Sequence, residues 1–196
     1  DRQIKERESN VRLSREDKSF LVNVFETCTK PREATELEEP LLKPARKRVE
    51  VDCNNLATFC SRFHTLTHGL AEAIASTEGS VCAGVSVVGT LTNGDVGDVD
   101  IFLICELGEA TTALTQVYDA LRTLGSGSKE QTCRLLVTRS RHAVSMFRIC
   151  DGKPLGLAVQ VILSVYKSVA HLLSSFDIDC CAVCYIPWKG VYCSPR

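Results

Sequence analysis

Hydrophobic residues change their spacing along this chain, and the change falls near residue 80. Before it, between residues 51 and 76, they recur every three or four positions, as Leu56, Phe59, Phe63, Leu66 and Leu70 do. That spacing places them on one side of a helix, so a single amphipathic helix is predicted over 51–76.

Beyond this point the helical spacing is replaced by short apolar runs bounded by glycine, proline and acidic residues. Such runs are typical of buried strands. The pattern predicts helices at 109–124 and 168–175, and strands at 80–88, 98–105, 134–140, 142–149, 157–166, 179–186 and 189–193. The first of these strands can also be interpreted as a strand that runs into a helix. Helices interleaved with buried strands predict an α/β (α+β) fold with a mixed sheet and flanking helices.

The first fifty residues follow neither pattern and are rich in Lys, Arg and Glu. Ser14 followed three residues later by Asp17 resembles a capping box, which predicts one short helix here. The basic cluster at 43–48 fits either a solvated linker or a patch that binds anions. We therefore expect a charged, partly helical N-terminal extension at 1–50, followed by one domain at 51–196 with its core at 80–196.

Composition adds few constraints. Hydrophobic residues make up 44% and the formal net charge is −1, so neither a nucleic-acid partner nor a membrane partner is indicated by the whole chain. No apolar stretch approaches a membrane span, and no secretory signal follows the opening DRQIKERESN. We therefore expect an intracellular, cytoplasmic protein. Six of its eleven cysteines stand singly among apolar neighbours and are expected to be reduced thiols: Cys53, Cys60, Cys82, Cys105, Cys133 and Cys150.

Two aspartates, Asp98 and Asp100, interrupt the apolar run at 98–105. Residues two apart on a strand point to the same face, so these carboxylates should project together while Val99 enters the core. Aspartate is a poor strand former and the two charges repel, so the pair needs compensation. Mg²⁺ (or Mn²⁺) would supply it, because it prefers oxygen ligands and is commonly held by one or two carboxylates plus substrate phosphates. Asp98 and Asp100 are thus the predicted metal ligands.

The segment before this pair is unusually rich in glycine. Its glycines are Gly84, Gly89, Gly94 and Gly97. They leave room for a triphosphate, and the backbone N–H groups of such a segment can bind one, especially at the start of a helix. The alternative is a turn closed by Asn93 and Gly94, in which Asp95 and Asp98 are simply solvated.

The segment 83–104 resembles the signature of the DNA polymerase β-type nucleotidyltransferase superfamily, in which a hydrophobic-Gly-(Gly/Ser) turn precedes an Asp-hydrophobic-(Asp/Glu)-hydrophobic strand. Ala83 and Gly84 match the turn. Val85 departs from the family's Gly or Ser, and Ser86 could take that role one place later.

This resemblance implies catalytic roles for Asp98 and Asp100 and a nucleoside triphosphate bound near Gly84, Ser86 and Gly89. Two basic residues, Arg139 at a strand junction and Lys167 at a helix start, are candidates for phosphate contacts.

Such enzymes use a third carboxylate on a neighbouring strand. By order along the sheet, that strand is 157–166, and its central polar residue is Gln160, whose amide is a weak magnesium ligand and cannot act as a base. Asp177 or Asp179 could substitute from the next strand, and Asp179 is our candidate third acid. Alternatively, Asp177 caps the strand and Asp179 is a structural acceptor.

The segment 176–192 also resembles the head domain of tRNA nucleotidyltransferases and poly(A) polymerases, through Asp177, Ala182 and Lys189-Gly190. The stretch 83–196 is still more similar to an uncharacterised nucleotidyltransferase-like domain that large eukaryotic and viral proteins carry beside ankyrin repeats. The segments that carry this likeness are RHAVSM, VQVILSVYKS and FDIDCC.

Together these features lead to two hypotheses. In the first, the domain binds a nucleoside triphosphate with Mg²⁺ or Mn²⁺ and transfers a nucleotidyl group to a hydroxyl of RNA, a nucleotide or a protein. In the second, it is a catalytically inert interaction module of a larger multidomain protein, which Val85 and Gln160 favour.

Overall fold

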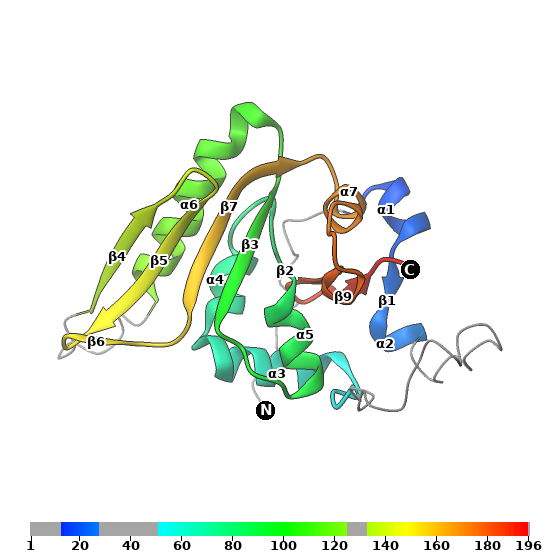
Figure 1. Cartoon of the computed structure of the whole chain (residues 1–196), viewed down its shortest axis with the longest axis horizontal. Helices are drawn as coiled ribbons and strands as arrows, with labels where there is room; N and C mark the ends of the chain where they lie inside the picture. Colours follow the sequence, from blue (N-terminus) through cyan, green and yellow to red (C-terminus); the bar gives the residue numbers. More distant parts are fainter. Residues whose placement is uncertain (1–12, 28–50, 125–132, 196) are drawn as a thin grey trace.

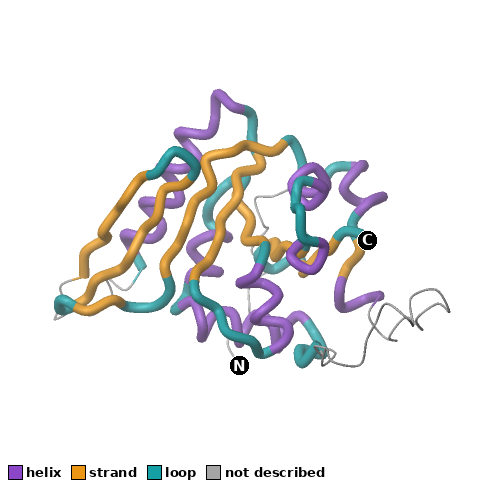
Figure 2. Tube along the Cα trace, viewed as in Figure 1, coloured by secondary structure: helices purple, strands orange, loops and turns teal. Residues whose placement is uncertain are grey.

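The structure, a computed structural model, describes residues 13–27, 51–124 and 133–195 (Figures 1 and 2). Within them the strands form one nine-stranded mixed sheet, with helices packed on both faces. The expected α+β class is therefore confirmed. The basic cluster at 43–48 lies outside the described residues.

The sheet runs in the order β1-β9-β8-β2-β3-β7-β5-β4, and the short β6 pairs with β5. Only β3 and β7 pair in parallel among the described strands; their neighbours pair antiparallel. The strands are β1 (Val22–Asn23), β2 (Ser80–Ala83), β3 (Asp98–Ile104), β4 (Cys133–Arg139), β5 (Ala143–Cys150), β6 (Lys153–Pro154), β7 (Ala158–Tyr166), β8 (Val183–Ile186) and β9 (Gly190–Cys193).

Helices form a layer on each side of this sheet. They are α1 (Arg15–Phe20), α2 (Val24–Thr27), α3 (Leu56–Thr67), α4 (Leu70–Ala75), α5 (Val85–Thr92), α6 (Ala110–Thr123) and α7 (Val169–Ser174). Apolar residues of α3, α4 and α6 pack against Val99, Ile101 and Leu103 of β3, while α7 packs with Phe102 on the opposite face. In Figure 1, α7 and α1 lie together at one end of that second face, and no described helix lies in front of β4, β5 and β7.

The expected single helix over 51–76 is wrong in two respects, because it begins only at Leu56 and breaks into α3 and α4. His68 and Gly69 both take left-handed backbone conformations, with φ of 50° and 87°. The Arg148 guanidinium of β5 donates to the carbonyl oxygens of Thr67 and His68 at 3.3 and 3.4 Å. A side chain eighty residues away thus binds the carbonyls that the break frees.

The expected strand over 179–186 is also too long. Residues Asp179–Cys181 form a 3₁₀ turn (η2), and only Val183–Ile186 pair in the sheet. The segment 80–88 follows its alternative interpretation, since β2 ends at Ala83 and α5 begins at Val85.

Part of the N-terminal extension is built into the sheet. β1 pairs with β9, with Val22 opposite Cys193. The predicted capping box is confirmed, because Asp17 accepts from the N–H of Ser14 at 2.9 Å and Ser14 Oγ accepts from the N–H of Asp17 at 3.0 Å. The other carboxylate oxygen of Asp17 accepts from the N–H of Ala170 at 2.8 Å, which joins α1 to α7.

Two of the cysteines expected to be reduced, Cys133 and Cys150, form a disulfide between β4 and β5. The expectation failed because these residues are register partners on adjacent strands, which their spacing along the chain does not reveal. Among the described residues, no helix is both long enough and apolar enough to span a membrane.

Candidate functional site

The carboxylates of Asp98 and Asp100 lie on one face of β3, at the strand's N-terminal end. Both side chains are half-buried, whereas Val99 and Ile101 between and after them are fully buried in the core on the other face. This is the alternation of an ordinary strand, so two adjacent charges stand on the face that α7 leaves uncovered at this end.

Gln160 completes this group from the parallel neighbour β7. Its Cα is the register partner of Asp100, and its Nε2 donates to Asp98 Oδ2 at 2.5 Å. The expectation that Gln160 stands on the strand beside the carboxylates is therefore confirmed. A neutral donor therefore stands beside the two carboxylates and binds Asp98.

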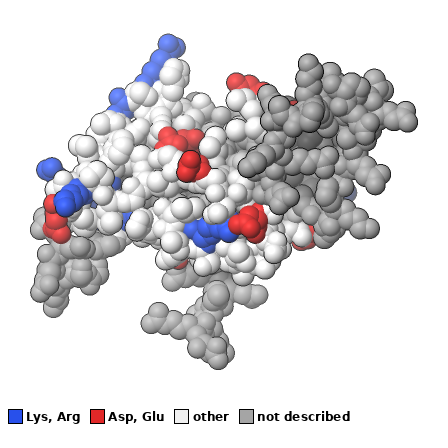
Figure 3. Space-filling view, turned by 60° about the horizontal axis from the view of Figure 1, so that its bottom comes forward, with Lys and Arg blue, Asp and Glu red and all other residues white. Residues whose placement is uncertain are grey.

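The charge of the pair is only partly compensated. Burial, and then repulsion from Asp98, raises the pKa of Asp100 to about 6. Within the described residues neither carboxylate has a Lys, Arg or His ion-pair partner. Figure 3, which brings this side of the molecule forward, shows an acidic patch surrounded by uncharged side chains. A bound cation would neutralise both charges.

The donor set fits a magnesium-type ion held jointly with a ligand. No group of three or more His, Cys, Asp or Glu side chains is placed to hold a metal in the described part of the chain. Asp98 and Asp100 supply acidic oxygens, and Mg²⁺ commonly needs only one or two carboxylates when phosphates complete its shell.

The turn between β2 and α5 faces this pair. Gly84 has φ +87° and ψ −149°, and a Cβ built on it would lie 4.0 Å from Asp100 Oδ2 and 3.6 Å from the Phe176 ring. A side chain here would therefore be strained and would fill the space beside the carboxylate. Gly84 is also the N-cap of α5, and no described side chain caps that helix, so its first N–H groups are available to an anion.

Ser86 lies in the first turn of α5. It is 3% exposed, and its hydroxyl has no hydrogen-bond partner among the described residues. A buried hydroxyl without a partner is costly, which is consistent with a ligand or water in its vicinity.

Gly89 lies in a helix, not in the loop where the sequence placed it, and its role in nucleotide binding stays a prediction. It lies in the middle of α5, where a Cβ would be 2.8 Å from Val96 Cγ2 and 3.0 Å from the Asp95 carbonyl oxygen. The glycine thus allows the segment that returns to β3 to pack directly on the helix. The expected glycine-rich loop is largely helical, and only residues 93–97 connect α5 to β3.

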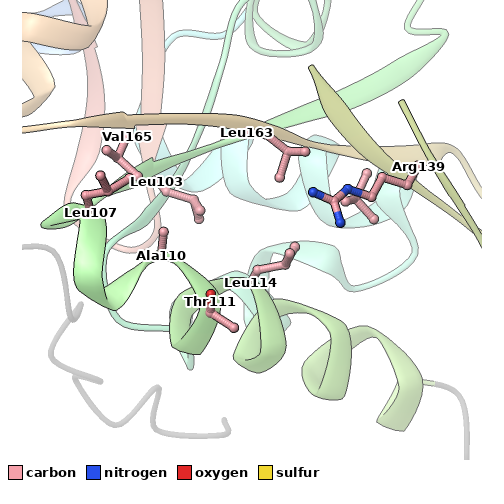
Figure 4. Close-up of a pocket in the computed structure, with 9 residues that line it drawn as sticks. Leu103, Leu107, Ala110, Thr111, Leu114, Arg139, Leu163 and Val165 are labelled. Atoms are coloured by element: carbon pink, nitrogen blue, oxygen red, sulfur yellow. The ribbon is translucent and has the colours of Figure 1, made fainter. Parts of the chain in front are cut away.

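The two expected phosphate contacts do not join this group. Arg139 pairs in register with Val144, whose side chain is in the core beneath α6, so it faces the side of the sheet opposite to Asp98. Figure 4 shows it over α6. Lys167 follows the C-terminal end of β7, seven residues beyond Gln160, which is on the order of 20 Å in an extended strand.

Asp177 and Asp179 are exposed on the segment that leads into β8. The strand expected over 179–186 begins only at Val183, so neither acid lies on it. The η2 turn that contains Asp179 contacts α5. The pKa of Asp100 is raised by burial and by Asp98, and not by Asp177 or Asp179, so the electrostatics give no sign that either acid lies close to it. The role of Asp179 as third acid stays a prediction.

One residue of this site was not foreseen from the sequence. Phe176 packs on Phe102 with ring centroids 5.6 Å apart and places its ring over Gly84. It therefore forms an apolar wall beside the turn that faces Asp100. Phe176 directly precedes Asp177 in the segment 176–192, and this position in the sequence could have pointed to its place in the site.

Comparison with known proteins identifies one family. The sequence model of the Gabija anti-defense 2 (Gad2) family matches residues 51–196, which is most of the chain and includes every residue of the site described above. No curated protein and no solved structure matches the chain.

Proposed function

The chain belongs to the Gabija anti-defense 2 family, and from that premise we propose that it acts against the Gabija defence through a metal-dependent, nucleotidyltransferase-like site. The observation that carries this proposal is the grouping of Asp98 and Asp100 on β3 with the Gly84 turn at the start of α5. Two adjacent carboxylates beside an uncapped helix N-terminus favour a cation and a polyphosphate bound together.

In this proposal Asp98 and Asp100 hold Mg²⁺ or Mn²⁺, which neutralises charge on the phosphates when it is bound. The N–H groups at the start of α5 bind phosphate oxygens, and Gly84 leaves the space that they need. Phe176 supplies an apolar surface next to this turn, and Gln160 keeps Asp98 oriented. Each residue contributes positioning and electrostatics, which account for most catalysis in phosphate chemistry.

The reaction that follows is nucleotidyl transfer. A hydroxyl oxygen of RNA, a nucleotide or a protein forms a bond to the α-phosphorus, the bond from that phosphorus to the β-phosphate breaks, and pyrophosphate leaves. The hydroxyl proton must pass to a base. Gln160 cannot accept it, so Asp179 remains the candidate for this role.

The second candidate function is a catalytically inert interaction module that retains the fold. Gln160 favours it, because an amide stands where a third carboxylate is needed and donates to one of the two that remain. In that case the protein would act against the defence by binding alone.

The experiment begins with ligand-induced stabilisation. Mg²⁺ with a nucleoside triphosphate should raise the melting temperature of the wild type, by roughly 5 to 10 °C at a hundredfold excess over Kd. Asp98→Ala with Asp100→Ala should abolish the rise. A control with Glu78→Ala and Asp119→Ala removes the same charge from exposed positions elsewhere and should keep it. If both double variants respond as the wild type does, the site is not at Asp98.

A second measurement separates the two functions. Labelled triphosphates are incubated with the protein, Mn²⁺ or Mg²⁺, and either total RNA or a lysate. Label that enters RNA or protein with the wild type, and is lost with Asp98→Ala, supports transfer. Stabilisation by the triphosphate without any incorporation would favour the inert module.

A further inference from the structure

A cavity lies on the face of the sheet opposite to Asp98 and Asp100, between α6 and strands β3, β5 and β7 (Figure 4). Its volume is about 290 Å³. Seven of its nine lining residues are apolar, and the other two are Thr111 and Arg139. Because Leu103 of this lining points away from the face that carries Asp98 and Asp100, the cavity is separate from the proposed nucleotide site.

Arg139 is the charged residue of this lining. Figure 4 shows its guanidinium extending from β4 over α6, toward the space above Leu114. Among the described residues its guanidinium has no hydrogen-bond or ion-pair partner. An arginine with five donors at the edge of an apolar cavity is complementary to a small oxyanion attached to an apolar body.

We propose that this cavity binds a small amphiphilic carboxylate, with the carboxylate on Arg139 and an aliphatic or aromatic body between Ala110 and Leu163. The apolar lining offers too few polar partners for a sugar or a polyphosphate. The volume is at the lower end of the range of roughly 300–1,000 Å³ for ligand pockets, which limits the ligand to a small one.

Octanoate is the probe for this site, measured by isothermal titration calorimetry on the full chain. Wild type should bind one octanoate saturably, whereas octylamine, with the same chain and the opposite charge, should not bind. Arg139→Gln should weaken octanoate binding by about tenfold or more, because it removes a charged hydrogen-bond donor. Arg141→Gln removes the same charge two residues away, outside the lining, and should bind as the wild type does.

A second variant tests the apolar part of the site. Ala110→Leu adds three carbons to the cavity and should prevent binding. Arg139 is exposed, so Arg139→Gln keeps the test decisive even if Ala110→Leu does not fold. The Asp98→Ala and Asp100→Ala double variant should bind octanoate normally, which distinguishes failure of this inference from failure of the proposed function. Absence of saturable binding to wild type, or equal binding by wild type and Arg139→Gln, would overturn the inference.

Discussion

At the scale of single residues, the site is organised around a charge that the fold alone does not stabilise. Burial, and then repulsion from Asp98, raises the pKa of the Asp100 carboxyl to about 6, well above its ordinary value of 3.8. Asp98 beside it accepts from Gln160, whereas no described hydrogen bond reaches the carboxylate of Asp100. An unfavourable charge retained in a half-buried position is typical of groups that act on a ligand.

Replacing Asp100 with asparagine should therefore stabilise the protein in the absence of metal. The folded pKa of about 6 is above the unfolded value of 3.8, so the free energy of unfolding of the wild type falls as pH rises from about 3.8 to about 6. Above that range the whole destabilising contribution of the ionised Asp100 is present. Asp100→Asn should gain roughly 1–2 kcal/mol at pH 7.5, after discounting for the exposed part of the side chain, and nothing near pH 3.5. Urea unfolding at both pH values measures this, and an equal gain at both would contradict it.

Gln160 offers the opposite change. Gln160→Glu places a third carboxylate beside Asp98 and Asp100, so the protein should lose stability at pH 7.5 without metal and bind Mn²⁺ several-fold more tightly. Titration calorimetry with Mn²⁺ alone measures the affinity. Gln116→Glu, at an exposed position of α6, is the matched control and should change neither property. Unchanged Mn²⁺ affinity in Gln160→Glu would mean that its side chain does not reach the metal.

At the scale of elements, hydrophobic spacing predicted most of the secondary structure, whereas the place of β7 beside β3 was expected from the family resemblance. It could not predict the break at His68 and Gly69, because the carbonyls freed there bond to Arg148, which is distant in sequence. Likewise, the position of Arg139 at a strand junction suggested a phosphate role but could not reveal which face of β4 the side chain occupies, since that depends on register with β5.

The α5 helix gives a test of packing in this region. Gly89→Ala should destabilise the protein by about 1 kcal/mol, because the clash with Val96 and the Asp95 carbonyl outweighs the helix propensity gained. Gly97→Ala is the control, since its Cβ would meet no atom within 4 Å, and it should change the free energy of unfolding by less than about 0.5 kcal/mol. A stabilised Gly89→Ala would show that the segment 93–97 moves away easily.

At the scale of the whole molecule, the proposed site lies between two additions to the central strands. On one side, residues 13–27 extend the sheet through β1 and join α1 to α7 through Asp17. This segment precedes the part of the chain that matches the family, 51–196, and was expected to be only an extension. On the other side, β4 and β5 form a disulfide-linked hairpin. Neither addition supplies a described residue of the carboxylate group, so stability and ligand binding should be separable.

The disulfide provides the test of that separation. Cys133 and Cys150 are 17 residues apart in sequence, and closing a loop of this size is worth about 3 kcal/mol in the unfolded-chain model. Replacing both with serine should lower the free energy of unfolding by about that amount in oxidising buffer, while a reductant should bring the wild type down to the level of the variant. Cys180→Ser, at an exposed free cysteine, should have little effect in either buffer. Because the hairpin lies outside the site, the variant should retain the full stabilisation by Mg²⁺ and triphosphate that the wild type shows. If that stabilisation disappeared while the protein remained folded, the hairpin would have to position β7 and Gln160. The hypothesis that the hairpin and the ligand site are independent would then be wrong.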